Sequence, residues 1–211
     1  DILQAQGDLA EARRIREEEQ LPVYQALGDK RLVAVTKVKI ADILQAQGDL
    51  GEARRLLEAE CLPAFEELGD RRSVAVTRGR IADILQAEGD LDGALDMHLE
   101  RLAIHRAMQD IDAIAHVRFS CAQLRLARGD HARDGLQTIH DELAEAFAIY
   151  LHLQRPDGIG ATGALLGQVL ALGGHPAEAI DVLRSAAEAF AKIGQQSGVD
   201  HCRALIEQIK G

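Results

Sequence analysis

The side chains best suited to acid–base or metal chemistry in this 211-residue sequence are eight histidines, all at or after His98. His98 and His105 would share one face of a helix, but seven residues place them about 10.5 Å apart along its axis, too far for one metal ion. The sequence has no H-x3-H pair and no cluster that mixes cysteine with histidine. We therefore predict histidines that are solvated or half-buried, and no metal site.

Other patterns that indicate catalysis are also missing from the sequence. It has no glycine-rich phosphate loop between a strand and a helix, no nucleophile elbow and no convincing triad. Carboxylates are abundant, but abundance on solvated helix faces does not define an acid–base pair. We predict a protein that is not an enzyme and that carries no cofactor.

The amino-acid composition indicates the cellular location of the protein and excludes some classes of partner. The three cysteines, Cys61, Cys121 and Cys202, are odd in number and far apart, which fits neither a disulfide framework nor a zinc site and favours a reducing, cytoplasmic location. The net charge of −10 disfavours nonspecific binding to nucleic acid, because such binding depends on neutralising phosphates. No run of about 18 apolar residues is present, so we expect no membrane span.

The chain is organised by a repeat. Residues 40–53, IADILQAQGDLGEA, return at 81–94 as IADILQAEGDLDGA, and their tail opens the chain. The matching Gly-Asp pairs begin at positions 7, 48 and 89, which sets a period of 41 residues. A fixed period of this size indicates a repeat array.

Each repeat is expected to hold two helices joined by a Gly-Asp turn. Ile40, Ile43 and Leu44 have the spacing of one helical face. Gly48 suits the left-handed residue that ends a helix, and Asp49 with the acid three residues later resembles a capping box. A thin helix pair cannot bury its own apolar faces, so neighbouring pairs must stack around a shared core.

These signals predict a single array over 1–211, with units at about 1–28, 29–69, 70–109, 110–155 and 156–194 and a terminal helix at 196–210. Helices are expected near 9–27, 30–47, 50–68, 71–88, 91–108, 131–154, 158–172 and from 176 to about 193. Pro22 and Pro63 fall well inside two of these helices and should kink them, because proline removes a backbone hydrogen bond.

The pattern Ile40-Ala41-x-x-Leu44, with Gly48-Asp49 in the turn and Ala53 beyond it, resembles the tetratricopeptide repeat signature. The period is longer than the usual 34 or so residues and is similar to the subclass found in kinesin light chains and in bacterial arrays of near-identical units. The resemblance implies an all-α, right-handed superhelical solenoid of antiparallel helix pairs, with about four and a half to five repeats and a C-terminal capping helix. It also implies a scaffold that binds a protein or peptide through a concave groove lined by the first helix of each pair.

On this resemblance, a strip of first-helix residues is the candidate partner-binding surface. Its members are Lys39, Asp42, Gln45, Arg80, Asp83, Gln86, His116, Phe119, Ser120 and Gln123, with Asp1 and Gln4 extending it into the first repeat. The divergent fourth repeat, from His116 to Gln123, would supply specificity. The competing interpretation is that these residues form ion pairs and hydrogen bonds between adjacent helices.

Two further sets of positions bear on binding. The carboxylate clamp of the family needs Lys and Asn where this chain has Val38 or Gly79 and Asp42 or Asp83, so we predict no such clamp. Lys37, Arg78 and Arg118 form either a basic stripe or a set of cations whose stems cover apolar surface and whose heads meet acids of the second helix.

Two alternatives to a peptide scaffold remain open. The array could be a self-assembling structural module, or a regulatory array attached to a catalytic or nucleotide-binding domain outside this fragment. Because the sequence begins inside a repeat, the second helix of the first unit would be uncovered, and a homo-oligomer could form through that N-terminal end.

Overall fold

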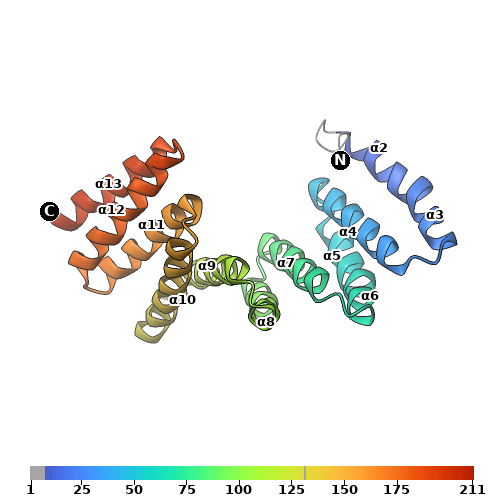
Figure 1. Ribbon diagram of the computed structural model, residues 1–211, viewed down its shortest axis with the longest axis horizontal. Helices are drawn as coiled ribbons and strands as arrows, with labels where there is room; N and C mark the ends of the chain where they lie inside the picture. The colour runs from blue at the N-terminus through green and yellow to red at the C-terminus, as the bar shows by residue number, and fades with distance from the viewer. Residues whose placement is uncertain (1–7, 131) are drawn as a thin grey trace. The chain divides into compact units, whose positions relative to one another are not determined.

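The computed structural model describes residues 8–130 and 132–211, and within them it contains helices and no β-strand (Figure 1). The helices are α2 (Leu9–Arg14), α3 (Leu21–Ala26), α4 (Lys30–Ala46), α5 (Leu50–Leu56), α6 (Leu62–Glu67), α7 (Arg71–Glu88), α8 (Leu91–Met108), α9 (Ile111–Arg128), α10 (Arg133–His152), α11 (Pro156–Leu172), α12 (Pro176–Lys192) and α13 (Gln196–Lys210). The predicted helices are thus found, with ends that differ by one or two residues. The all-α class is confirmed.

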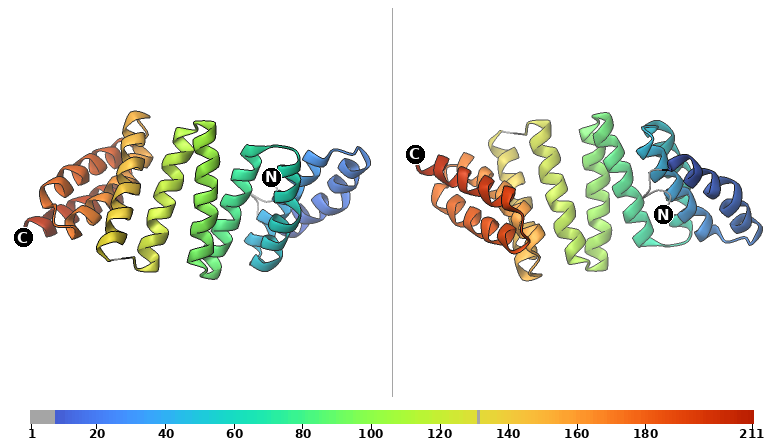
Figure 2. Two further views of the ribbon diagram at one scale, coloured as in Figure 1. Left: turned by 90° about the horizontal axis from the view of Figure 1, so that it is seen from below. Right: turned by 90° about the horizontal axis from the view of Figure 1, so that it is seen from above.

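The chain divides into two compact units, one ending at Ile104 and the other beginning at His105, inside α8. Within each unit, consecutive helices lie side by side and run antiparallel (Figure 2). In the first unit α4 packs on α5, and in the second α11 packs on α12 and α12 on α13. Each unit therefore consists of stacked helix pairs, as the repeat pattern predicted.

Aspartates begin the helices of the repeated segment. Their carboxylates accept a hydrogen bond from the backbone N–H three residues on, at Asp8, Asp29, Asp49, Asp70, Asp90 and Asp110. Gly48 has a φ of 86°, the left-handed conformation expected of it. In a full capping box the Glu52 side chain would also accept a hydrogen bond from the Asp49 N–H. This second bond is not formed, because the Asp49 N–H donates to Leu44 O at 2.9 Å and Glu52 accepts from Arg55 instead.

The two internal prolines are accommodated by π-helical turns, η1 (Ile15–Gln20) and η2 (Leu57–Cys61), which sequence analysis did not predict. Pro22 and Pro63 follow at the start of α3 and α6. A π turn contains one more residue than an α turn, which shifts the backbone hydrogen-bond pattern of the helix by one residue. Proline lacks a backbone N–H, and here it falls in a segment whose hydrogen bonds are already shifted. Similarly, α11 begins at Pro156 rather than near 158, because proline is tolerated in the first helical turn.

Small residues let the helices of each unit approach closely. Ala53 and Ala94 are both fully buried. In the second unit, a Cβ built on Gly167 of α11 would lie 2.5 Å from Leu183 Cγ of α12. Leu183 is itself fully buried, so that contact cannot relax easily.

Two glycine substitutions should therefore have opposite effects on the free energy of unfolding. Gly51→Ala in α5 meets no atom within 4 Å and should stabilise the protein by about 0.4–1 kcal/mol by restricting the unfolded chain. Gly167→Ala should destabilise it by about 1–3 kcal/mol through overpacking. Urea unfolding followed by circular dichroism measures both, and a neutral Gly167→Ala would contradict the close approach of α11 and α12.

Asp70 provides a test of the caps that depends on pH. The hydrogen bond from the Ser73 N–H, with further bonds from the Ser73 hydroxyl and Arg31, holds the pKa of Asp70 below its usual value. A depressed pKa means that ionised Asp70 stabilises the fold above the unfolded pKa of about 3.9, and that this contribution is lost as pH falls.

Asp70→Ala should cost about 0.5–2 kcal/mol at neutral pH, while Asp70→Asn keeps an oxygen that can accept the bond and should cost less. The difference in melting temperature between wild type and Asp70→Asn should shrink when the pH is lowered from 7 to 3. A difference that grows at low pH would show that the carboxylate does not stabilise the helix start.

Candidate functional site

The candidate strip in the first unit lies on α4 and α7, the first helices of two successive repeats. Its central contact is an ion pair between repeats, in which Arg80 Nε donates to Asp42 Oδ1 at 2.6 Å and Arg80 Nη2 donates to Oδ2 at 3.1 Å. Both side chains are 31% exposed. The bonds to Asp42 raise the pKa of Arg80 above its usual value. For this pair, the interpretation as a ladder between adjacent helices is confirmed.

The remaining strip residues of the first unit differ in exposure. Lys39 and Gln45 on α4 are half-buried, whereas Asp83 and Gln86 on α7 are exposed, and Val76 on the same helix is 42% exposed. The helix α7 therefore presents an acid and an amide one turn apart, with an apolar side chain about two turns before the acid. Asp1 and Gln4, which would continue it, lie outside the described residues, as does the N-terminal end proposed for self-association.

Gly79 packs directly against a residue of the next helix. Arg101 of α8 lies so close that a Cβ on Gly79 would be 2.9 Å from Arg101 Nη1. At the equivalent position one repeat earlier, Val38 is buried. Val38 therefore fills with its own side chain a place that the Arg101 guanidinium fills at Gly79.

Lys37, Arg78 and Arg118 meet acids of the second helices. Lys37 Nζ lies 2.5 Å from Glu60 Oε2, Arg78 Nε lies 2.9 Å from Glu100 Oε2, and Arg118 Nε lies 2.6 Å from Glu145 Oε2. All three cationic side chains are half-buried. The interpretation as covered cations is confirmed, and a free basic stripe is wrong.

The fourth-repeat candidates lie on α9 in the second unit. His116 and Gln123 are exposed, while Ser120 donates its hydroxyl hydrogen bond to the backbone oxygen of His116 at 3.1 Å. Phe119 is half-buried and packs against the core that contains Ala122. The helix thus brings the four residues to neighbouring positions, but Phe119 also contributes to the core.

A buried carboxylate beside α9 was missed by sequence analysis. The Glu142 side chain on α10 is 4% exposed, and its oxygens lie 3.2 Å from Arg125 Nε and 3.5 Å from Arg118 Nη1. Burial raises the pKa of Glu142, and the two arginines oppose that shift. The available signal was the spacing of Arg118 and Arg125, which places two cations on one face of α9.

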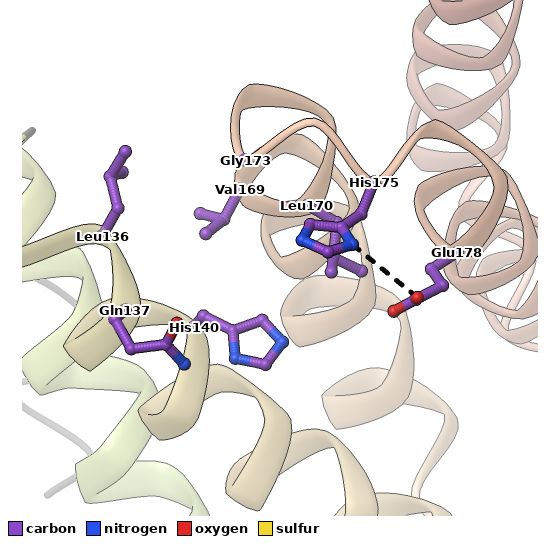
Figure 3. A pocket seen from close by; sticks show the side chains of 8 residues that line it. All are labelled: Leu136, Gln137, His140, Val169, Leu170, Gly173, His175 and Glu178. Carbon is purple, nitrogen blue, oxygen red and sulfur yellow. Dashed lines mark ion pairs between the residues drawn. The ribbon is translucent and has the colours of Figure 1, made fainter. Parts of the chain in front are cut away.

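A cleft of about 400 Å³ lies between α10, α11 and the start of α12 (Figure 3). His140 of α10 and His175, which precedes α12, both line it, and His175 Nδ1 lies 3.7 Å from Glu178 Oε1. Over the part of the chain that the structure describes, no three side chains of His, Cys, Asp or Glu are grouped so that they could hold a metal ion. The cleft is lined by both polar and apolar side chains, and the described residues supply no ligand set for a metal ion there.

No helix among residues 8–130 and 132–211 has both the length and the apolar character needed to cross a membrane. In the described part of the chain Cys61, Cys121 and Cys202 are buried and form no disulfide, and burial raises the pKa of Cys61 to about 12. These thiols are therefore packed as small apolar side chains rather than poised as nucleophiles.

Comparison with known proteins identifies the repeat. Two family models described as tetratricopeptide repeat match the sequence, one over residues 32–107 and one over residues 1–18 and 160–185. Together they match more than half of the 211 residues. A search of curated protein sequences found no match.

Solved structures show the same fold at low sequence identity. A putative kinesin light chain from Podosopora anserina with nearly identical TPR-like repeats is 18% identical, with a TM-score of 0.59 and coverage of 86% of this chain and 95% of that one. MamA is 15% identical, with a TM-score of 0.61 and coverage of 92% and 90%. Rap protein complexed with Competence and Sporulation Factor is 18% identical, with a TM-score of 0.50 and coverage of 90% and 55%.

The repeated Gly-Asp turns, the stacked antiparallel helix pairs and the two family models agree. The chain belongs to the tetratricopeptide repeat family.

Proposed function

We propose that the chain is a non-enzymatic scaffold that binds a protein or peptide through its first-helix strip. Tetratricopeptide repeats support protein interaction as the general class of function. The observation that carries the proposal is the exposure of three side chains on α7, Asp83 and Gln86 one turn apart and Val76 about two turns before Asp83. An amide can donate to and accept from a peptide backbone, a carboxylate can accept its N–H groups, and an exposed valine offers apolar contact.

The strip is not uniformly available to a partner. Asp42 and Arg80 bind each other, so their charges are already compensated. We assign partner contact to the exposed side chains of the first helices, which are Asp83, Gln86 and Val76 in the first unit and His116 and Gln123 in the second. Rap protein, which was solved with Competence and Sporulation Factor, supports the proposal as a protein of similar fold with a bound partner.

The proposal includes a reducing, cytoplasmic setting. Cys61, Cys121 and Cys202 are each buried, and within the described residues none of them forms a disulfide. Thiols kept apart inside separate parts of the core fit a protein that does not depend on disulfides.

Peptides selected on the whole chain from a phage-displayed library of random 12-residue sequences test this assignment. Replacing two strip residues together, Asp83→Arg and Gln86→Ala, should weaken a strip-binding peptide at least tenfold, a loss of about 1.4 kcal/mol. Asp96→Arg on α8 is the matched control, because Asp96 is exposed on a second helix and should change affinity less than twofold.

Calorimetric titration gives the dissociation constants, and circular dichroism shows that each variant keeps its helices. If every selected peptide binds the double variant as tightly as wild type, the strip is not the partner surface.

A further inference from the structure

Two clefts occupy equivalent places in successive repeats of the first unit. One, of about 350 Å³, is lined by Tyr24 of α3 and Val33 of α4, and the other, of about 270 Å³, is lined by Phe65 of α6 and Val74 of α7. Six residues of the second cleft lie 41 positions after a residue that lines the first, and Ile104 is the exception, so the array builds a similar depression twice. The glycine of a helix-ending turn borders each one, at Gly28 and Gly69.

The π-helical turns lie immediately before the aromatic wall of each cleft. η1 ends at Gln20, four residues before Tyr24, and η2 ends at Cys61, four residues before Phe65. The extra residue of a π turn rotates the segment that follows relative to a continuous α-helix. In the third repeat α8 is a continuous α-helix, so the feature belongs to the two repeats that carry an internal proline.

Most of the cations that line the clefts are balanced by carboxylates. Lys37 Nζ lies 2.5 Å from Glu60, and Arg78 Nη2 lies 3.2 Å from Glu66. Lys30, which also lines the first cleft, is balanced too, because its Nζ lies 2.6 Å from Glu67 Oε1. Arg71 lines the second cleft, and its exposed side chain forms no ion pair or hydrogen bond with any described residue.

Apolar surface continues outward from each cleft. Leu27, beside Gly28, is 72% exposed, and Leu68, beside Gly69, is 41% exposed. Each repeat therefore offers a hollow with an aromatic wall and an exposed leucine within a few residues, and the second hollow adds the unbalanced cation Arg71. A bulky apolar side chain is complementary to each hollow, and a carboxylate close to it is complementary to Arg71.

We propose that the two clefts form a docking surface for a peptide segment whose bulky apolar side chains enter the clefts, one in each, and whose carboxylate pairs with Arg71 at the second. This surface is separate from the first-helix strip. Val33 of the first cleft and Asp42 of the strip are nine positions apart, which is about two and a half helical turns, so they lie on opposite sides of α4. The two surfaces can therefore be tested independently.

The test uses peptides selected on the whole chain from the random 12-residue phage library. We expect one class of selected peptides to be rich in Leu or Phe together with Asp or Glu. Ala64→Leu should fill the first cleft, since Ala64 lines it, and should weaken that class at least tenfold. Ala59→Leu is the control, because Ala59 is exposed in η2 and does not line the cleft.

Charge is tested at the second cleft. Arg71→Glu should weaken the same class at least fivefold, whereas Arg72→Glu, an exposed neighbour outside the cleft, should change affinity less than twofold. Arg71 is exposed, so this variant keeps the proposal testable even if Ala64→Leu fails to fold.

The strip variant Asp83→Arg should leave this class unchanged. The proposal is overturned if no acidic and apolar class is selected, if control and cleft variants weaken binding equally, or if Asp83→Arg abolishes binding while the cleft variants do not.

Discussion

The structure depends on one constraint, which is that a pair of helices is too thin to bury its own apolar face. Packing against the next helix pair removes that apolar face from water. The helices must approach closely for this packing to exclude water. Ala53 and Ala94 are fully buried in the first unit, while Gly167 admits Leu183 in the second. The same requirement is met by alanine at Ala53 and Ala94 and by glycine at Gly167.

Polar contacts follow from this stacking because they are formed where neighbouring helices are already close. Arg80 reaches Asp42 of the preceding repeat, and the pair adds direction to an interface whose main stabilisation is apolar. Where one member changes, its neighbour changes with it. The second repeat has Val38 and Glu60, and the third has Gly79 and Arg101, whose guanidinium occupies the space that the valine side chain leaves.

Much of the fold was predictable from the sequence because its strongest signals are local. The Gly-Asp turns at Gly48 and Gly89 determine where helices end and begin, and periodicity indicates which residues are buried. The π turns before Pro22 and Pro63 were not predictable, because a proline can be accommodated by a kink or by a shifted ladder, and packing decides between them. The Glu52 side chain likewise binds Arg55 rather than the Asp49 backbone N–H, and the sequence offered both as nearby partners.

The candidate site was less predictable for a related reason. The spacing placed Asp42, Arg80, Asp83 and Gln86 on helix faces, but it could not show that Arg80 and Asp42 bind each other, since that depends on the distance between repeats. The distance between successive repeats also determines whether a surface cleft found in one repeat is formed again in the next. Because one repeat follows another within the first unit, any hollow formed by a proline-bearing second helix and the next first helix occurs in duplicate. A ligand that fills both hollows binds the second one as an intramolecular step, so even two weak contacts combine into a stronger one.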